Sequence, residues 1–171
     1  MNFTLPDIKN NIDVFTGVIK KYNIYSDCVS EETLDTGECM DMAYYKSLYD
    51  KFHMSRLVSS NDLTTCFNVL RWVHEQMLFK NTGTYNGKLE TGDILDYCRA
   101  KHVILNCALH SIVLTELLIS VGIPCRSIQC LPFDPLDNDS HFINHAFIKS
   151  LNEWIAVDPS YATYFLDGQG K

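Results

Sequence analysis

A cysteine, a histidine and an aspartate in the second half of the chain could together form a nucleophilic centre. Cys107 precedes an apolar segment, and His145 and Asp158 bracket two strand-like runs. A tight turn at Leu151-Asn152, where Asn tolerates a positive φ, would place His145 directly opposite Asp158. Opposite residues have Cβ atoms about 4.5–5.5 Å apart, which suits an imidazole that is hydrogen-bonded to a carboxylate. Such a pair beside a thiol is the arrangement of a cysteine nucleophile.

The segment after Cys107 has the composition of a helix at the centre of a hydrophobic core. Asn106 is a good N-cap residue, residues 108–121 are almost all apolar, and Gly122 and Pro124 end the helix. The first turn of a helix carries unpaired N–H groups and a partial positive charge. This charge favours a thiolate at Cys107. The backbone N–H of Cys107 is also a candidate donor to an oxyanion.

Five short segments follow one another in a recognisable order. They are Leu70-Arg-Trp-Val-His74, Asn106-Cys107, Gly122-Ile-Pro-Cys-Arg126, His145-Ala-Phe and Trp154-Ile-Ala-Val-Asp158-Pro-Ser160. From about Leu63 to Leu166 the chain therefore resembles the transglutaminase-like superfamily, whose fold is related to that of papain-like cysteine peptidases. The resemblance implies Cys107 as the nucleophile, His145 as the general base and acid, and Asp158 as the residue that orients the imidazole. The family includes transferases, peptidases, amidases, deglycosylating enzymes and inactive relatives.

The composition indicates an ordinary globular protein. Its 171 residues, 46% of them hydrophobic and 20% charged, suit a single compact domain. The net charge of −7 argues against binding to nucleic acids and to anionic membranes. The first residues lack the basic start and the apolar stretch of a signal peptide. Seven cysteines without a regular framework favour a reducing, cytoplasmic setting.

The order of the expected elements, helices first and strands later, predicts an α+β fold. In this fold a central buried helix packs on a small antiparallel sheet, as in the transglutaminase and papain-like proteins. We expect residues 1–60 to form a helical N-terminal extension that packs on a core of residues 61–171. The expected elements are helices at 38–57, 63–79, 91–99 and 108–121, a strand at 126–131, a loop at 132–141 and then the hairpin.

These observations predict a cysteine-dependent hydrolase or acyl transferase that acts on an amide bond through a thioester acyl-enzyme. The catalytic residues would be Cys107, His145 and Asp158, without a cofactor or a metal ion. The expected substrate is a peptide or a protein, or else a small amide. Peptidase or amidase activity is favoured over protein cross-linking, because no acceptor site is evident. The alternative is an inactive domain of the same family that binds proteins or peptides.

Some side chains could instead form a metal site or supply a different base. Cys98, His102, Cys107 and His110 could hold a zinc ion, which would make Cys107 a ligand instead of a nucleophile. The loop residues Asp134, Asp137 and Asp139 could bind calcium, although a solvated acidic loop is the simpler interpretation. His110, one helical turn after Cys107, could replace His145 as the base. His141, which lies beside the acidic loop, has no predicted role.

Three further side chains have an expected structural place. Cys125 and Cys130 should point to opposite faces of an extended segment, which disfavours a bridge between them, and both are expected to be buried thiols. Arg126 is expected to form an internal salt bridge. Trp154 should share a face of its strand with Asp158, where it either shields the His–Asp pair or packs in the core.

Overall fold

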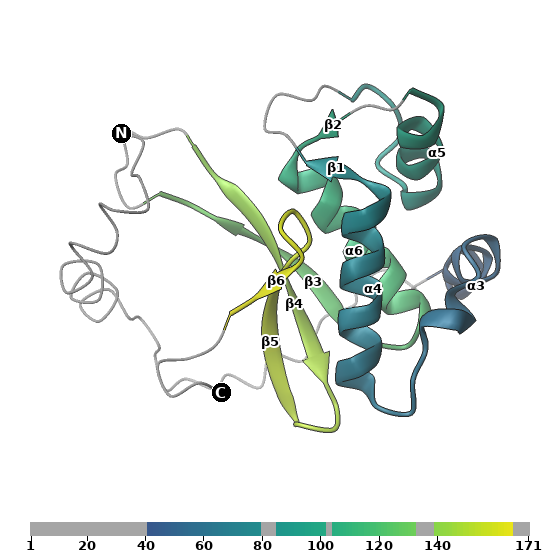
Figure 1. Ribbon diagram of the computed structural model, residues 1–171, viewed down its shortest axis with the longest axis vertical. Helices are drawn as coiled ribbons and strands as arrows, with labels where there is room; N and C mark the ends of the chain where they lie inside the picture. Colours follow the sequence, from purple (N-terminus) through teal and green to yellow (C-terminus); the bar gives the residue numbers. More distant parts are fainter. Residues whose placement is uncertain (1–40, 80–84, 102–103, 133–138, 166–171) are drawn as a thin grey trace. The chain divides into compact units, whose positions relative to one another are not determined.

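The structure is a computed structural model, and it describes residues 41–79, 85–101, 104–132 and 139–165 (Figure 1). The described residues belong to one compact unit that begins at Asp41. Its helices are α3 (Met42–Lys51), a short 3-10 helix (Met54–Leu57), α4 (Asp62–Gln76), α5 (Thr91–Lys101) and α6 (Cys107–Ser120). Its strands are β1 (Leu78–Phe79), β2 (Ile104–Leu105), β3 (Cys125–Cys130), β4 (His141–Ile148), β5 (Glu153–Asp158) and β6 (Thr163–Tyr164).

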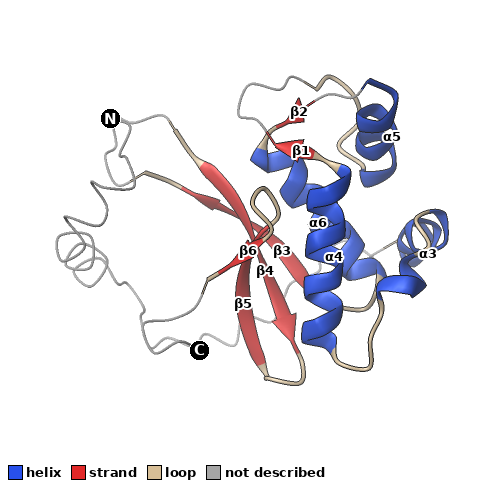
Figure 2. Cartoon of the chain, in the orientation of Figure 1, coloured by secondary structure: helices blue, strands red, loops and turns tan. Residues whose placement is uncertain are grey.

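The helices and strands confirm the predicted α+β class. Strands β3, β4, β5 and β6 form an antiparallel sheet in chain order, and β1 and β2 form a separate parallel pair. Figure 2 shows the helices gathered on one side of the four-stranded sheet. The expected boundary between residues 60 and 61 stays a prediction, and residues 1–40 of the expected N-terminal extension lie outside the described residues.

Helix α6 is the centre of the core, as its composition predicts. Among its fully buried side chains are Val113, Leu114, Leu117 and Leu118, which contact residues of both the other helices and the sheet. Burial of each such side chain contributes about 1.5–3 kcal/mol to folding relative to leaving it exposed. The apolar surface of this helix is therefore what holds the helical layer on the sheet.

The two ends of α6 are capped by the residues that the sequence indicates. At the start, the Asn106 side chain accepts a hydrogen bond from the Leu109 N–H at 3.2 Å. At the other end, the N–H of Gly122 bonds to Ile119 O and that of Ile123 bonds to Leu118 O, both at 2.9 Å. This pair of bonds is a Schellman motif, which requires a left-handed residue at its turn. Gly122 supplies it with a φ of +84°.

A single carboxylate on α6 anchors two other helices. Glu116 accepts hydrogen bonds from the Tyr44 hydroxyl of α3 and from the Thr91 N–H at the start of α5, the latter at 2.9 Å. Burial and this carboxylate together raise the pKa of Tyr44, so the phenol remains a donor at physiological pH. Glu116 therefore fixes where α3 and α5 begin relative to α6.

The β4–β5 hairpin has a longer loop than the sequence suggests. Residues 149–152 form a four-residue loop, with hydrogen bonds from Leu151 N to Ile148 O and from Asn152 N to Lys149 O. Asn152 adopts the expected positive φ, at 55°. Ser150 is tied to α4, because its N–H donates to the Asp62 carboxylate at 2.9 Å. The predicted two-residue turn is therefore wrong, and the pairing of the strands shifts by two positions.

Hydrogen bonds between α6 and β4 show that the two elements run in the same direction. The Ser111 hydroxyl donates to Ile143 O at 3.2 Å, and the Asn144 amide donates to Ser111 O at 2.9 Å. Beyond the C-terminal end of α6, the Phe147 N–H donates to Pro124 O at 2.8 Å. The start of α6 and the start of β4 consequently lie at the same end of the packed pair.

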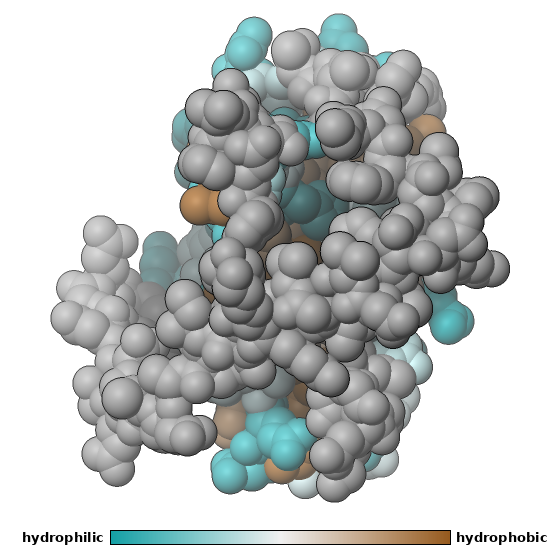
Figure 3. All heavy atoms as spheres, turned by 90° about the vertical axis from the view of Figure 1, so that its left-hand side faces the viewer, coloured by the Kyte–Doolittle hydropathy of each residue, from teal (hydrophilic) through white to brown (hydrophobic). Residues whose placement is uncertain are grey.

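Part of the apolar surface of the described residues remains exposed. Leu131 is 73% exposed and Tyr161 is 61% exposed. Figure 3 shows hydrophilic and hydrophobic side chains side by side on one face of the molecule. Within the described ranges, no helix has both the length and the apolar character needed to cross a membrane.

The Schellman turn yields the first prediction. Gly122→Ala places a side chain at a φ of +84°, where an added Cβ meets no atom within 4 Å. The cost is therefore conformational alone, and the free energy of unfolding should fall by about 1–2 kcal/mol in urea titrations. Gly92→Ala, in the first turn of α5, is the matched control and should not lower stability. Equal stability of the two variants would contradict the assigned turn.

Candidate active site

Cys107 is the first residue of α6. Its side chain is 6% exposed, and the helix N-cap is the Asn106 that precedes it. The first turn of an α-helix has N–H groups without intrahelical acceptors. The Asn106 side chain accepts a hydrogen bond from the Leu109 N–H, whereas the N–H groups of Cys107 and Ala108 have no acceptor within the helix. The thiol thus lies at the positive end of the helix, beside N–H groups that can bind an oxyanion.

Asp158, at the end of β5, forms the only pair of a histidine with a carboxylate among the described residues. Its Oδ2 lies 2.7 Å from Nε2 of His141, the first residue of β4. Its Oδ1 accepts the N–H of Ser160 at 2.8 Å. The carboxylate is 3% exposed, so both oxygens are held by protein donors away from solvent. This arrangement fixes the orientation of the His141 imidazole.

The expected pairing of His145 with Asp158 is wrong, because of the longer hairpin loop. His145 lies opposite Ala156 on β5 and opposite Arg126 on β3. Burial and the Arg126 guanidinium together lower its pKa. Its Nδ1 has no hydrogen-bond partner among the described residues. The surroundings of His145 therefore disfavour the imidazolium, whereas the neighbour of His141 is a carboxylate.

His141 and the start of α6 are joined by a chain of packed rings. The ring of Phe79 lies between His110 of α6, at 5.7 Å between centroids, and His141, at 6.4 Å. Phe79 is held in place by its pairing with Leu105, two residues before Cys107. Together with the shared direction of α6 and β4, these contacts bring the thiol and the His141–Asp158 pair to one end of the fold.

His110 is not available as a different base or as a zinc ligand. Its Nδ1 lies 2.9 Å from Asn106 O and its Nε2 lies 3.2 Å from Met77 O. Both ring nitrogens therefore face carbonyl oxygens, and burial lowers the pKa of the imidazole. Over the described ranges, no three His, Cys, Asp or Glu side chains are grouped to hold a metal ion. His102, Asp134 and Asp137, which the sequence offers as zinc or calcium ligands, lie outside the described residues.

The other thiols differ from Cys107 in their surroundings. Cys66 is buried in the core and Cys125 is partly buried against it, and burial raises the pKa of each to about 12. Cys130, contrary to the expectation, is exposed and lies directly opposite His141 on the neighbouring strand. The five described cysteines are free, and Cys125 and Cys130 lie at opposite ends of β3 without a bridge, as expected.

Trp154 and Arg126 contact each other instead of shielding the His–Asp pair. The Arg126 guanidinium lies over the indole ring at 4.8 Å from its centroid, and Phe147 packs on the same ring at 5.4 Å. The indole is 36% exposed, so it is not a core residue. This cation–π contact holds the positive charge of Arg126 on the strand face that also carries His145.

The sequence also allows His141 to meet Asp158, although the expected two-residue turn favours His145. His141 and His145 are four positions apart on one strand, so they share a face, and both have the parity that suits Asp158. In the observed register Asp158 follows Val157, the partner of Asn144, so it is level with Ile143 and diagonal to both His141 and His145. The tertiary structure, and not the loop length alone, decides that His141 meets the carboxylate. Phe79 and Tyr161 also lie beside His141, yet no spacing in the sequence relates them to it.

Comparison with known proteins gives one result. The model of a family described as the transglutaminase-like superfamily matches residues 55–159. These residues include α4, α6, the β4–β5 hairpin and the side chains of Cys107, His141 and Asp158. No curated protein and no solved structure matches the chain.

The buried histidines predict how stability depends on pH. The pKa values of His110 and His145 are lowered in the fold, so below about pH 6.5 the unfolded chain binds more protons than the folded one. The free energy of unfolding should therefore decrease as the pH falls from 7 to 5. His145→Gln should reduce this slope, which urea titrations at several pH values would measure. A slope that the substitution leaves unchanged would contradict the assigned burial of the neutral imidazole.

Proposed function

Because the chain belongs to the transglutaminase-like superfamily, we propose that it is a cysteine-dependent hydrolase or acyl transferase that acts on an amide bond. Cys107 is the nucleophile, His141 is the general base and acid, and Asp158 orients the imidazole. The observation that carries this proposal is the 2.7 Å contact between His141 and the buried Asp158. This contact lies at the end of the fold where α6 begins with Cys107.

The proposed reaction begins at the Cys107 thiol. His141 accepts the thiol proton, and the sulfur forms a bond to the carbonyl carbon of the amide. The oxygen of the tetrahedral intermediate becomes negative and is stabilised by the Cys107 N–H and by the positive end of α6. The C–N bond then breaks, and the amine leaves with the proton that His141 returns to it. A thioester remains on Cys107.

The second half of the proposed reaction releases the acyl group. His141 takes a proton from water or from a second amine, which attacks the thioester carbon, and the Cys107 sulfur leaves with a proton from the imidazolium. Water as the acceptor gives hydrolysis, and an amine gives transfer. We propose hydrolysis of a peptide, protein or small amide as the main activity, since no second binding site for an amine-bearing protein is evident among the described residues.

The charges around the two histidines support His141 as the base. The imidazole must become positive in the transition state, and Asp158 stabilises that charge at a distance of 2.7 Å. The neighbour of His145 is Arg126, which has the opposite effect and lowers the pKa. We therefore assign the role of general base to His141 and not to His145, which the sequence predicts.

The reactivity of the thiols tests the proposed pair. Iodoacetamide should label Cys107 at neutral pH about tenfold faster than Cys66 and Cys125, whose high pKa values keep them protonated. His141→Ala should slow the labelling of Cys107, and His145→Ala should leave it unchanged. Mass spectrometry of the labelled peptides gives each rate separately, which distinguishes Cys107 from the exposed Cys130.

The opposite pattern is equally informative. Slow labelling of Cys107 in His145→Ala, with His141→Ala unchanged, would restore the triad that the sequence predicts. Insensitivity of Cys107 to both substitutions would show that the thiol is not activated, and a binding domain would then be the better interpretation.

Turnover of amide substrates tests the orienting carboxylate. Asp158→Asn should lower kcat/KM by about 10²–10⁴, because the amide cannot stabilise the imidazolium. Cys107→Ala should abolish turnover, and Asp96→Asn, on the exposed ion pair of α5 with Lys51, is the control that should retain it. Cleavage of a peptide panel, followed by mass spectrometry, measures all four proteins. Full activity of Cys107→Ala would rule out the mechanism.

A further inference from the structure

A cavity borders His141 on the side of the rings of Phe79 and Tyr161. We propose that this cavity binds the amine side of the scissile amide and selects an apolar side chain there. This inference rests on the proposed function, whose reaction it extends to a class of substrate: amides whose amine part is an apolar or aromatic amino acid residue.

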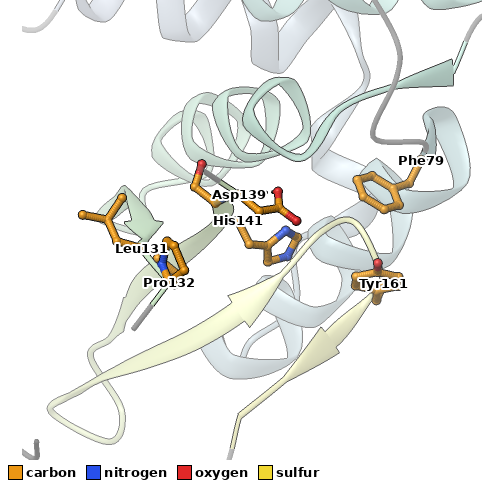
Figure 4. A pocket seen from close by; sticks show the side chains of 8 residues that line it. Phe79, Leu131, Pro132, Asp139, His141 and Tyr161 are labelled. Carbon is orange, nitrogen blue, oxygen red and sulfur yellow. Dashed lines mark hydrogen bonds between the residues drawn. The ribbon is translucent and has the colours of Figure 1, made fainter. Parts of the chain in front are cut away.

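The cavity has the size and the lining of a site for one residue. Its volume is about 390 Å³, near the lower end of the roughly 300–1,000 Å³ that small-molecule sites occupy. Figure 4 shows the rings of Phe79 and Tyr161 on one side of His141 and the side chains of Leu131 and Pro132 on the other. Four apolar or aromatic side chains therefore surround one imidazole.

The position of the cavity indicates which part of the substrate enters it. His141 is one of its walls, and Cys107 is not among the described residues that line it. In the proposed reaction the acyl group is bonded to the thiol, while the nitrogen receives its proton from the imidazole. A cavity at the imidazole and away from the thiol consequently faces the nitrogen side of the bond.

The apolar walls are pre-formed and exposed. The rings of Phe79 and Tyr161 pack against each other at 5.2 Å, and Tyr161 packs on His141 at 6.0 Å. Leu131 and Tyr161 are nevertheless 73% and 61% exposed. A bound apolar side chain would remove this surface from water without a rearrangement of the rings. The cavity therefore favours a large apolar side chain over glycine.

The charge at the cavity favours a basic group over an acidic one. Asp139 contributes a carboxylate to the lining, and Asp158 lies behind His141. The amine that leaves is mostly protonated at neutral pH, since an α-amino group has a pKa of about 7.7–8.0. A carboxylate at this position stabilises the departing cation and repels an acidic side chain.

Binding of small amines to the Cys107→Ala protein tests the inference without any turnover. L-phenylalaninamide carries the amine and the apolar side chain, glycinamide lacks the side chain, and N-acetyl-L-phenylalaninamide lacks the free amine. The Cε1–H NMR signal of His141, identified by its absence in His141→Ala, reports occupation of the cavity. We expect a saturable shift with L-phenylalaninamide and affinity about tenfold weaker for glycinamide.

Two substitutions in the walls complete the test. Leu131→Ala and Tyr161→Ala should each weaken the binding of L-phenylalaninamide, and both side chains are exposed, so the fold should persist. Leu151→Ala, in the exposed loop of the β4–β5 hairpin, is the matched control and should bind as the parent does.

Three results would overturn the inference. They are no saturable shift at His141, equal affinity for glycinamide and L-phenylalaninamide, and equal or tighter binding of the N-acetyl compound, which would place the acyl side in the cavity. Failure of the proposed function has a different signature: Cys107 would react slowly with iodoacetamide while the selective binding of L-phenylalaninamide persisted.

Discussion

The buried hydrogen bonds between α6 and β4 are the constraint on which the site depends. The Ser111 side chain of α6 donates to the backbone of β4, and the Asn144 side chain of β4 donates to the backbone of α6. Both side chains lie in the interior, where an unpaired polar group costs about 1–3 kcal/mol. Apolar packing alone would tolerate several positions of α6 along the sheet, whereas these hydrogen bonds are satisfied at only one position of α6 relative to β4. That position places Cys107 and His141 at the same end. The chemistry proposed for this protein therefore depends on two polar residues that do not take part in it.

Two histidines on one face of β4 acquire different properties from their neighbours. His141 meets the buried Asp158, which accepts two hydrogen bonds, and His145 meets Arg126, which Trp154 holds at 4.8 Å. An imidazole next to a carboxylate can accept a proton at little cost, and one next to a guanidinium cannot. The separation of roles between two identical side chains follows from the electrostatics of the sheet.

The sequence predicts most of the helical layer and little of the sheet geometry. The N-cap at Asn106, the left-handed turn at Gly122 and the apolar run between them are local features, and the structure confirms each of them. The hairpin depended on a contact that is not local. Ser150 bonds to Asp62 of α4, 88 residues away in the chain, and stabilises a four-residue loop where two residues were expected. The resulting shift of two positions kept every side chain on its predicted face but moved Asp158 from the place opposite His145 to a place level with Ile143, between the two histidines.

By itself the sequence determined the fold class, the family and the place of a cysteine at the start of a buried helix, because capping, hydrophobic periodicity and motif order are properties of neighbouring residues. Only the tertiary structure decided which histidine meets Asp158 and which rings surround it. Phe79, His141 and Tyr161 come from three separate segments and meet through the packing of α6 on the sheet. Spacing along the chain cannot predict these contacts, because the distance in space between the three segments is set by how they pack on the common core.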